Sequence, residues 1–169
     1  MIRTAVLGVI ALLSAVQAAD AQRAAAKKET PPPMQNTTTL PPLKRQPTPK
    51  AVVDEHLAAI NTCDWTRLMA QYPNDVEFFL PGGKVVKGRA EVAELFRGFV
   101  KSVKDGGLCG LKFTVEHSFP VGDTINMVWV GNADFLAEPY RGIEAYVTKD
   151  GLMQAQVTTF DGAQLKLKK

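Results

Sequence analysis

Two adjacent glycines and a lysine, Gly82-Gly83-Lys84, form the first group in the sequence whose residue types suggest chemistry. Glycine-rich loops bind phosphate when a lysine and a Ser or Thr follow the glycines at fixed spacing and a helix begins directly behind them. Here Lys84 is followed by Val85-Val86, and a β-branched pair favours a strand. We therefore expect a tight turn between two strands at this point, and no nucleotide site.

The chain has two histidines, His56 and His117, and both occupy positions where the flanking apolar residues predict a buried face. Zinc sites need three or four ligands, usually at close spacing. No His-x-x-x-His pair, no Cys-x-x-Cys pair and no cluster of carboxylates accompanies either histidine. A nucleophile elbow is also missing from the sequence, and neither cysteine lies in a recognisable catalytic context. The sequence therefore predicts no metal site and no cofactor.

Cys63 and Cys109 are the two cysteines of the chain. In an exported protein two cysteines favour a disulfide, and closing a loop of this length stabilises a fold by about 4 kcal/mol if chain entropy dominates. Separation along the sequence does not determine how close two Cα atoms lie. A disulfide and two unpaired thiols therefore both remain open from the sequence alone.

Residues 1–21 have the pattern of a secretory signal peptide. Arg3 precedes an apolar run from Ala5 to Val16, and the small residues of Ala19-Asp20-Ala21 flank a cleavage site. The apolar run is shorter than the roughly 20 residues that a membrane-spanning helix needs. We expect this segment to be removed and the mature protein to be periplasmic or secreted.

Residues 22–49 predict a disordered, basic, proline-rich linker. Residues 22–50 hold seven of the eleven prolines and six basic residues against one acidic residue, without apolar periodicity, so they offer little surface to bury. Residues 51–169 contain 13 basic and 15 acidic residues. The positive charge therefore belongs to the linker, where it either contacts an anionic surface or, as we favour, only keeps the chain soluble. We expect the folded domain, residues 50–169, to bind no nucleic acid.

Helices are expected first in this domain. Apolar residues recur at helical spacing from Val52 to Ile60, and again from Trp65 to Tyr72 after a break that places Asp64 at an N-cap. One apolar stripe predicts a third helix from Val92 to Val103, which Asp105-Gly106-Gly107 ends.

Strands are expected to fill the rest of the domain. Residues 76–80 and 84–87 predict a hairpin around the glycine turn, and residues 111–119 alternate strictly between apolar and polar side chains. Three more strands are predicted at residues 124–133, 140–149 and 152–160. The last two are joined by the two-residue turn Asp150-Gly151. Helices at the start and strands at the end predict an α+β fold in which one curved sheet wraps around the helices.

This order of elements, together with the stretch AAINTCDWTRLMAQYPNDVEFFLPGGKVVKGRAEVAELFRGF, resembles the nuclear transport factor 2-like superfamily, whose bacterial members include SnoaL-like polyketide cyclases and ketosteroid isomerase. The motifs that carry the resemblance are Ala59-Ile60-Asn61, Asp64-Trp65, Asp75 and Gly88-Arg89. The resemblance covers residues 51–169. It implies a cone-shaped half-barrel with an apolar pocket at its wide mouth, and commonly a homodimer formed through the sheet. It implies no single chemistry, because this fold hosts many.

A position-by-position comparison with ketosteroid isomerase implies that this chain lacks that activity. The carboxylate base of that enzyme, at the end of its first strand and before a proline, corresponds to Leu80 before Pro81. Without the base, nothing moves the proton from carbon to carbon. The hydrogen-bond donor on the first helix corresponds to His56, and the protonated acid of the pocket corresponds to Glu144.

The resemblance also implies which residues line the cone. It makes His56 and Glu144 the candidate acid–base or anchoring groups. The candidate ligand-binding residues are Phe78, Leu80, Trp129, Tyr146, Gln156, Thr158 and Phe160. Periodicity alone leaves open whether the face of the last strand that carries Gln156 or the face that carries Met153 points inward. It also leaves open a core position for His56 and a surface position for Glu144.

Three functions therefore remain open, and we favour the first. It is an exported domain that binds a small, mostly apolar molecule in the cone. The second is an interaction module, in which the domain dimerises on a basic tether and side chains fill the pocket. The third is a lyase, isomerase or hydratase that uses His56 and Glu144.

Overall fold

The structure is a computed structural model that describes residues 39–169. Helix α2 (Pro49–Asn61) and the short helix α3 (Trp65–Met69) come first, followed by β1 (Glu77–Phe79), β2 (Val85–Lys87) and helix α4 (Arg89–Phe99). Four longer strands then follow: β3 (Lys112–Val121), β4 (Thr124–Asn132), β5 (Tyr140–Lys149) and β6 (Leu152–Thr158). The predicted α+β order is confirmed. The predicted signal peptide and the first part of the predicted linker lie outside the described residues.

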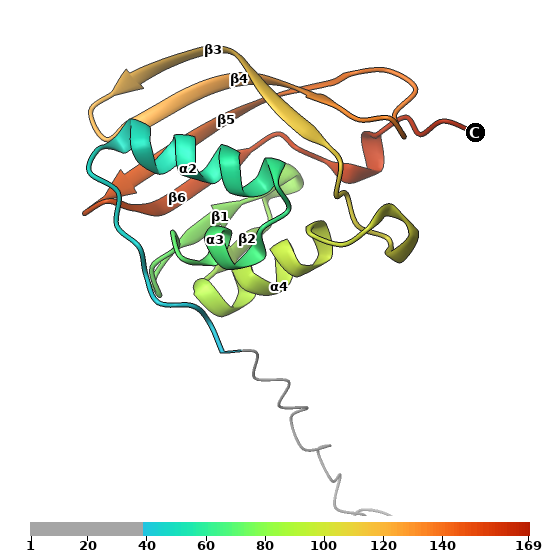
Figure 1. Cartoon of the computed structure of the whole chain (residues 1–169). Coiled ribbons are helices and arrows are strands. Elements are labelled where there is room, and N and C mark those ends of the chain that lie inside the picture. Colours follow the sequence, from blue (N-terminus) through green and yellow to red (C-terminus); the bar gives the residue numbers. More distant parts are fainter. Residues whose placement is uncertain (1–38) are drawn as a thin grey trace, which may run out of the picture. The chain divides into compact units, whose positions relative to one another are not determined.

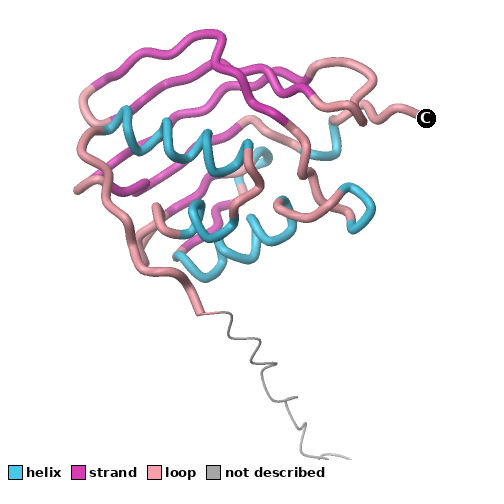
Figure 2. Tube along the Cα trace, in the orientation of Figure 1, coloured by secondary structure: helices cyan, strands magenta, loops and turns pink. Residues whose placement is uncertain are grey.

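The strands form one six-stranded sheet in the order β2-β1-β6-β5-β4-β3. β1 pairs with β6 in parallel, and the remaining neighbours are antiparallel. The sheet curves around the helices: α2 lies across β3 to β6, α4 packs on β2, and α3 lies between α2 and α4 (Figures 1 and 2). The concave face of the sheet and the helices enclose the core.

Helix α2 is held in place at both ends. The Thr48 side chain accepts a hydrogen bond from the Ala51 amide at 3.1 Å, and Pro49 occupies the first helical position, so the helix has both a capping side chain and a residue suited to its first turn. At the other end, the Asn61 side chain bonds to both backbone groups of Phe113, at 2.9 Å and 2.7 Å. These bonds fix the rotation of α2 and point His56 toward the sheet.

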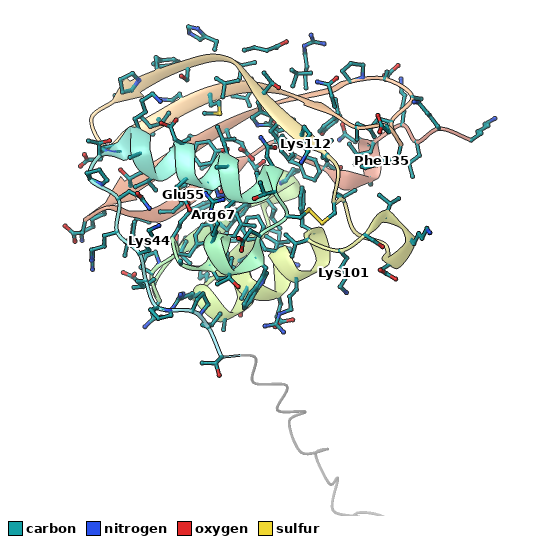
Figure 3. The ribbon with its side chains drawn as sticks, viewed as in Figure 1. Lys44, Glu55, Arg67, Lys101, Lys112 and Phe135 are labelled. Carbon is teal, nitrogen blue, oxygen red and sulfur yellow. A yellow bond between two sulfur atoms is a disulfide. The ribbon has the colours of Figure 1, made fainter. Side chains whose placement is uncertain are left out.

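A salt bridge also ties α2 to α3. Arg67 donates two hydrogen bonds to the Glu55 carboxylate, at 2.8 Å and 2.7 Å, and the two side chains point toward one another from the two helices (Figure 3). Asp64 caps α3 by accepting from the Arg67 amide at 2.9 Å, as its N-cap position predicted.

Cys63 and Cys109 form a disulfide, with Cα atoms 5.7 Å apart (Figure 3). The bond joins the loop after α2 to the loop before β3, next to the Asn61 contacts with Phe113. The sequence left open a disulfide or two unpaired thiols, and the structure contains the disulfide.

Helix α4 is shorter than predicted. It ends at Phe99, and the Phe99 carbonyl accepts a hydrogen bond from the Leu108 amide at 2.8 Å. Val103, which the apolar stripe assigned to this helix, is 41% exposed in a separate 3₁₀ turn. The apolar stripe continues beyond the end of the helix, but residues 100–108 form a loop that leads to Cys109 and its disulfide with Cys63. In this loop Val103 no longer packs against the sheet as a helical residue would.

Strand β3 departs from its predicted alternation at a β-bulge. Val115 pairs with Trp129 but His117 pairs with Val128, so Glu116 is the extra residue. A one-residue shift moves each later side chain to the opposite face. His117 is therefore exposed on the convex face of the sheet, and the expectation that it lies on a buried face is wrong.

The predicted linker is wrong in its last third, because residues 39–48 pack along the domain. The Lys44 amide donates to the Ala70 carbonyl at 2.8 Å, and the Gln46 amide donates to the Gly151 carbonyl at 2.9 Å. Gly151 has φ +75°, and a Cβ there would lie 2.4 Å from the Gln46 carbonyl, so the turn needs glycine. Disorder was expected because the segment has no apolar periodicity, but its backbone forms these hydrogen bonds, the Leu40 side chain packs against the core and the Arg45 side chain donates to the Asp150 carbonyl.

Helix α4 also holds this segment. Arg89, at the first position of α4, donates from Nε and Nη2 to the Met69 carbonyl at 3.1 Å and 2.7 Å, and from Nη2 to the Pro41 carbonyl at 2.5 Å. One buried guanidinium thus joins residues 39–48, the end of α3 and the start of α4.

None of the helices in residues 39–169 has the length and apolar character of a membrane span.

Candidate functional site

A cavity of about 100 Å³ lies between α2, α4 and the concave face of the sheet. Its walls are apolar and come from α2, β1, α4, β3 and the segments after β1 and β6: Leu57, Ile60, Phe78, Leu80, Leu95, Phe96, Phe99, Phe113 and Phe160. Its polar lining residues are His56, Glu144, Tyr146, Gln156 and Thr158. Apart from Glu144, which is partly exposed, these polar residues are buried, whereas most of the apolar lining residues are partly exposed: Leu57, Leu80, Leu95, Phe99, Phe113 and Phe160. The cavity therefore has an apolar opening and a polar floor.

The polar floor is one connected hydrogen-bond network. Tyr72 donates from its hydroxyl to Gln156 Oε1 at 2.9 Å, and the same hydroxyl lies 3.2 Å from His56 Nδ1. Gln156 Nε2 donates to Glu144 Oε1 at 3.4 Å. His56 and Glu144 are thus brought to one network, but Tyr72 and Gln156 stand between them.

Glu144 accepts hydrogen bonds on both carboxylate oxygens. The Thr158 hydroxyl donates to Oε1 at 2.5 Å, and the Tyr146 hydroxyl donates to Oε2. Burial raises the pKa of Glu144, and the hydrogen bonds from Thr158, Tyr146 and Gln156 oppose that rise because they favour the ionised form. The same burial and the nearby carboxylate raise the pKa of Tyr146, which keeps the phenol protonated as a donor.

His56 is neutral at physiological pH, because burial lowers the pKa of its imidazole from 6.5 to about 4. The Tyr72 hydroxyl gives its proton to Gln156, so it accepts from His56, which places the imidazole proton on Nδ1. Nε2 then carries a lone pair, and within residues 39–169 it has no hydrogen-bond partner. The floor thus offers two acceptors, His56 Nε2 and the Glu144 carboxylate.

Trp129 is the one predicted ligand-binding residue that does not line the cavity. Its indole lies over Gly142, where an added Cβ would come within 2.3 Å of the ring, and it packs edge-on against Phe113 with centroids 5.0 Å apart. The indole N–H is close enough to Glu144 to lower the pKa of that carboxyl. It forms no hydrogen bond within residues 39–169. Trp129 therefore packs against two residues that line the cavity, Phe113 and Phe160, without lining it itself.

The other predicted residues line the cavity. Sequence reasoning missed Tyr72, which links His56 to Gln156, and the aromatic walls Phe96, Phe99 and Phe113. All four lie in apolar runs that were assigned to the core. A tyrosine in such a run is the available signal, because a buried hydroxyl needs a partner.

Metal-binding geometry is not found in the described part of the chain: no three His, Cys, Asp or Glu side chains gather there. His56 lies at the cavity floor, whereas His117 lies on the convex face of β3, so these two side chains do not share a site.

The fold and the enclosed pocket define an α+β cone of the nuclear transport factor 2-like class. A family model for the SnoaL-like domain matches residues 53–156, and the chain belongs to this family. A search of curated proteins by sequence found no match.

Solved structures with the same fold are distant in sequence. An NTF2-like protein of unknown function from Cytophaga hutchinsonii is 17% identical, with a TM-score of 0.55 over 72% of this chain and 96% of that chain. A computationally designed 17-OHP binder is 18% identical, with a TM-score of 0.57 over 72% and 98%. A hypothetical protein with a ketosteroid isomerase-like fold from Catenulispora acidiphila, in complex with trimethylamine, is 15% identical, with a TM-score of 0.51 over 70% of this chain and 90% of that chain. At these identities the likeness shows the fold alone.

Proposed function

We propose that this domain binds a small, mostly apolar molecule carrying a hydrogen-bond donor. The observation that carries the proposal is the division of the cavity into an apolar wall and a floor with acceptors. Apolar enclosure with a few convergent polar groups is typical of small-molecule sites. A ligand with one donor would bond to His56 Nε2 or add a hydrogen bond to Glu144, whereas a pure hydrocarbon would leave His56 Nε2 without a partner.

Binding is a better account of this site than acid–base catalysis. An imidazole with a pKa of about 4 is a weak base at neutral pH, because efficient general bases have pKa values near the working pH. At the position of the isomerase base the chain has Leu80, which lines the cavity and has no carboxylate. These two features speak against proton abstraction from carbon, and in particular against ketosteroid isomerase activity.

Export and dimerisation are part of the same proposal. The disulfide between Cys63 and Cys109 supports an oxidising compartment, and the predicted signal peptide agrees with it. The convex face of the sheet supports a homodimer, because it exposes large apolar side chains on three strands: Phe119, Val121, Ile143 and Val157, between 46% and 61% exposed. A second copy of the chain would bury them.

A binding titration tests the proposal. We expect small alcohols such as phenol and cyclohexanol to raise the melting temperature and to bind with measurable heat, because ligands that bind only the folded state stabilise it. His56→Phe keeps an aromatic ring but removes the hydrogen-bond acceptor. It should lower the affinity for an alcohol by roughly three- to tenfold, which is the loss expected for one neutral hydrogen bond.

Two variants complete this experiment. His117→Phe makes the same change on the convex face and should leave binding unchanged. Leu57→Trp adds bulk at the opening of the cavity and should abolish binding without unfolding the domain, since Leu57 is partly exposed. Binding that survives Leu57→Trp, or a complete absence of binding across the alcohols, would contradict the proposal.

A further inference from the structure

The strongest unexplained feature of the cavity is a carboxylate without a cation. None of the salt bridges in residues 39–169 includes Glu144, and the residues that line the cavity contain neither lysine nor arginine. Charged groups inside proteins are normally paired, because an isolated charge loses its hydration without compensation. When Glu144 is ionised, no lysine or arginine among the residues that line the cavity balances its charge.

The hydrogen bonds to Glu144 orient the carboxylate but do not neutralise it. Tyr146, Thr158 and Gln156 all carry neutral donors, and each donates toward a carboxylate oxygen. These three donors favour the ionised form and oppose the rise in pKa that burial causes, and a cation bound beside the carboxylate would favour the ionised form further. His56 adds no positive charge, since its burial keeps the imidazole neutral.

The lining of the same cavity also contains a cluster of aromatic rings. Phe99, Phe113 and Phe160 form a triangle of rings whose centroids lie 5.8 Å, 6.1 Å and 6.2 Å apart, and all three line the cavity. Ring faces carry a negative quadrupole that attracts cations, most strongly when water is excluded. Alkylated ammonium ions suit such walls, because their charge is spread over apolar methyl groups.

We propose that the ligand of this cavity is a small alkylammonium ion, held between the Glu144 carboxylate and the phenylalanine triangle. The inference rests on the proposed function, because it names the chemical class of the molecule that the cavity binds. The volume of about 100 Å³ restricts that class to ions with a few heavy atoms. A primary, secondary or tertiary ammonium would also direct its N–H to Glu144 or to His56 Nε2.

Two probes of similar shape separate charge from size. Trimethylammonium chloride and tert-butanol each carry one donor and three methyl groups, and only the first is charged at neutral pH. We expect trimethylammonium to bind at least about tenfold more tightly in calorimetric titrations with the full mature chain. Glu144→Gln keeps the size of the side chain and should remove this preference, because it weakens trimethylammonium binding more than tert-butanol binding.

A matched control places the same substitution elsewhere. Glu116→Gln removes one carboxylate from the convex face, where Glu116 pairs with Arg141, and should leave the preference intact. Phe99→Leu should weaken the binding of trimethylammonium more than the binding of tert-butanol, because it removes an aromatic ring and keeps an apolar side chain. A thermal melt of each variant checks that it is folded.

The outcomes separate this inference from the proposed function. If tert-butanol, phenol or cyclohexanol binds and trimethylammonium does not, or if Glu144→Gln retains the preference, the alkylammonium inference is overturned and the binding function stands. If neither the ion nor any alcohol binds, both are overturned. Only a charge preference that depends on Glu144 supports the inference.

Discussion

Acidification should destabilise the folded domain through one buried group, His56. In the folded protein, burial lowers the pKa of this imidazole from 6.5 to about 4. Between these two values the unfolded chain binds one more proton than the folded chain does. The contribution of His56 to stability is therefore complete above about pH 6.5 and is lost as the pH falls toward 4.

The magnitude follows from the size of the shift. One pKa unit corresponds to about 1.4 kcal/mol, so the free energy of unfolding should lose about 3 kcal/mol through His56 across this interval. Glu144 contributes with the opposite sign, because burial raises its pKa and so favours the protonated form in the folded protein. Its contribution is complete at low pH and is lost as the pH rises through its raised pKa. A variant of His56 is needed to separate the two.

Urea unfolding at half-unit steps of pH measures this effect. His56→Asn retains an amide near the position of Nδ1 for Tyr72 and does not titrate. Its stability is lower at every pH because of lost packing, but the difference from the parent protein should shrink by about 3 kcal/mol as the pH falls from 7 to 4. His117→Asn removes the exposed histidine and serves as the control. A constant difference between parent and His56→Asn would refute the buried, neutral assignment of His56.

Three further predictions concern the rest of the domain. Reduction, or replacement of both Cys63 and Cys109 by serine, should lower the free energy of unfolding by about 4 kcal/mol in urea titrations, because the bond closes a loop with a sequence separation of 46 residues; an unchanged midpoint would contradict this. Arg89→Met should release residues 39–48, since it removes the donors to Met69 and Pro41, and limited proteolysis should then cut before residue 49 while the parent chain resists. Ile143→Lys, on the exposed convex face, should convert a homodimer to a monomer in light scattering, and a monomeric parent protein would rule out the dimer.

Local signals in the sequence were enough to predict most elements. The helical spacing from Val52 to Ile60, the cap at Asp64 and the turn at Asp150-Gly151 all lie where they were expected. Each depends on residues within a few positions of one another. Asp150 and Gly151 both have positive φ, at 52° and 75°, which is what a two-residue hairpin turn requires and what an Asp-Gly pair permits. The family could be recognised for the same reason, because its motifs mark the ends of elements.

Features that depend on distant partners could not be read from the sequence. The bulge at Glu116 reverses the faces of β3, and only the pairing of Trp129 and Val128 with that strand reveals it. The order of residues 39–48 depends on backbone groups of Ala70 and Gly151 and on the Arg89 guanidinium, so the proline content of the segment predicted the wrong state.

The candidate site shows the same division. The family resemblance pointed to His56, Glu144 and Gln156 as inward-facing groups where periodicity left the question open, and in the structure all three line one cavity. Only the tertiary structure interposes Tyr72 between His56 and Gln156, removes Trp129 from the wall and leaves Glu144 without a cation. Periodicity determines which face of an element a side chain occupies. The protonation state and the partners of a buried polar group depend on which other faces the fold brings against it.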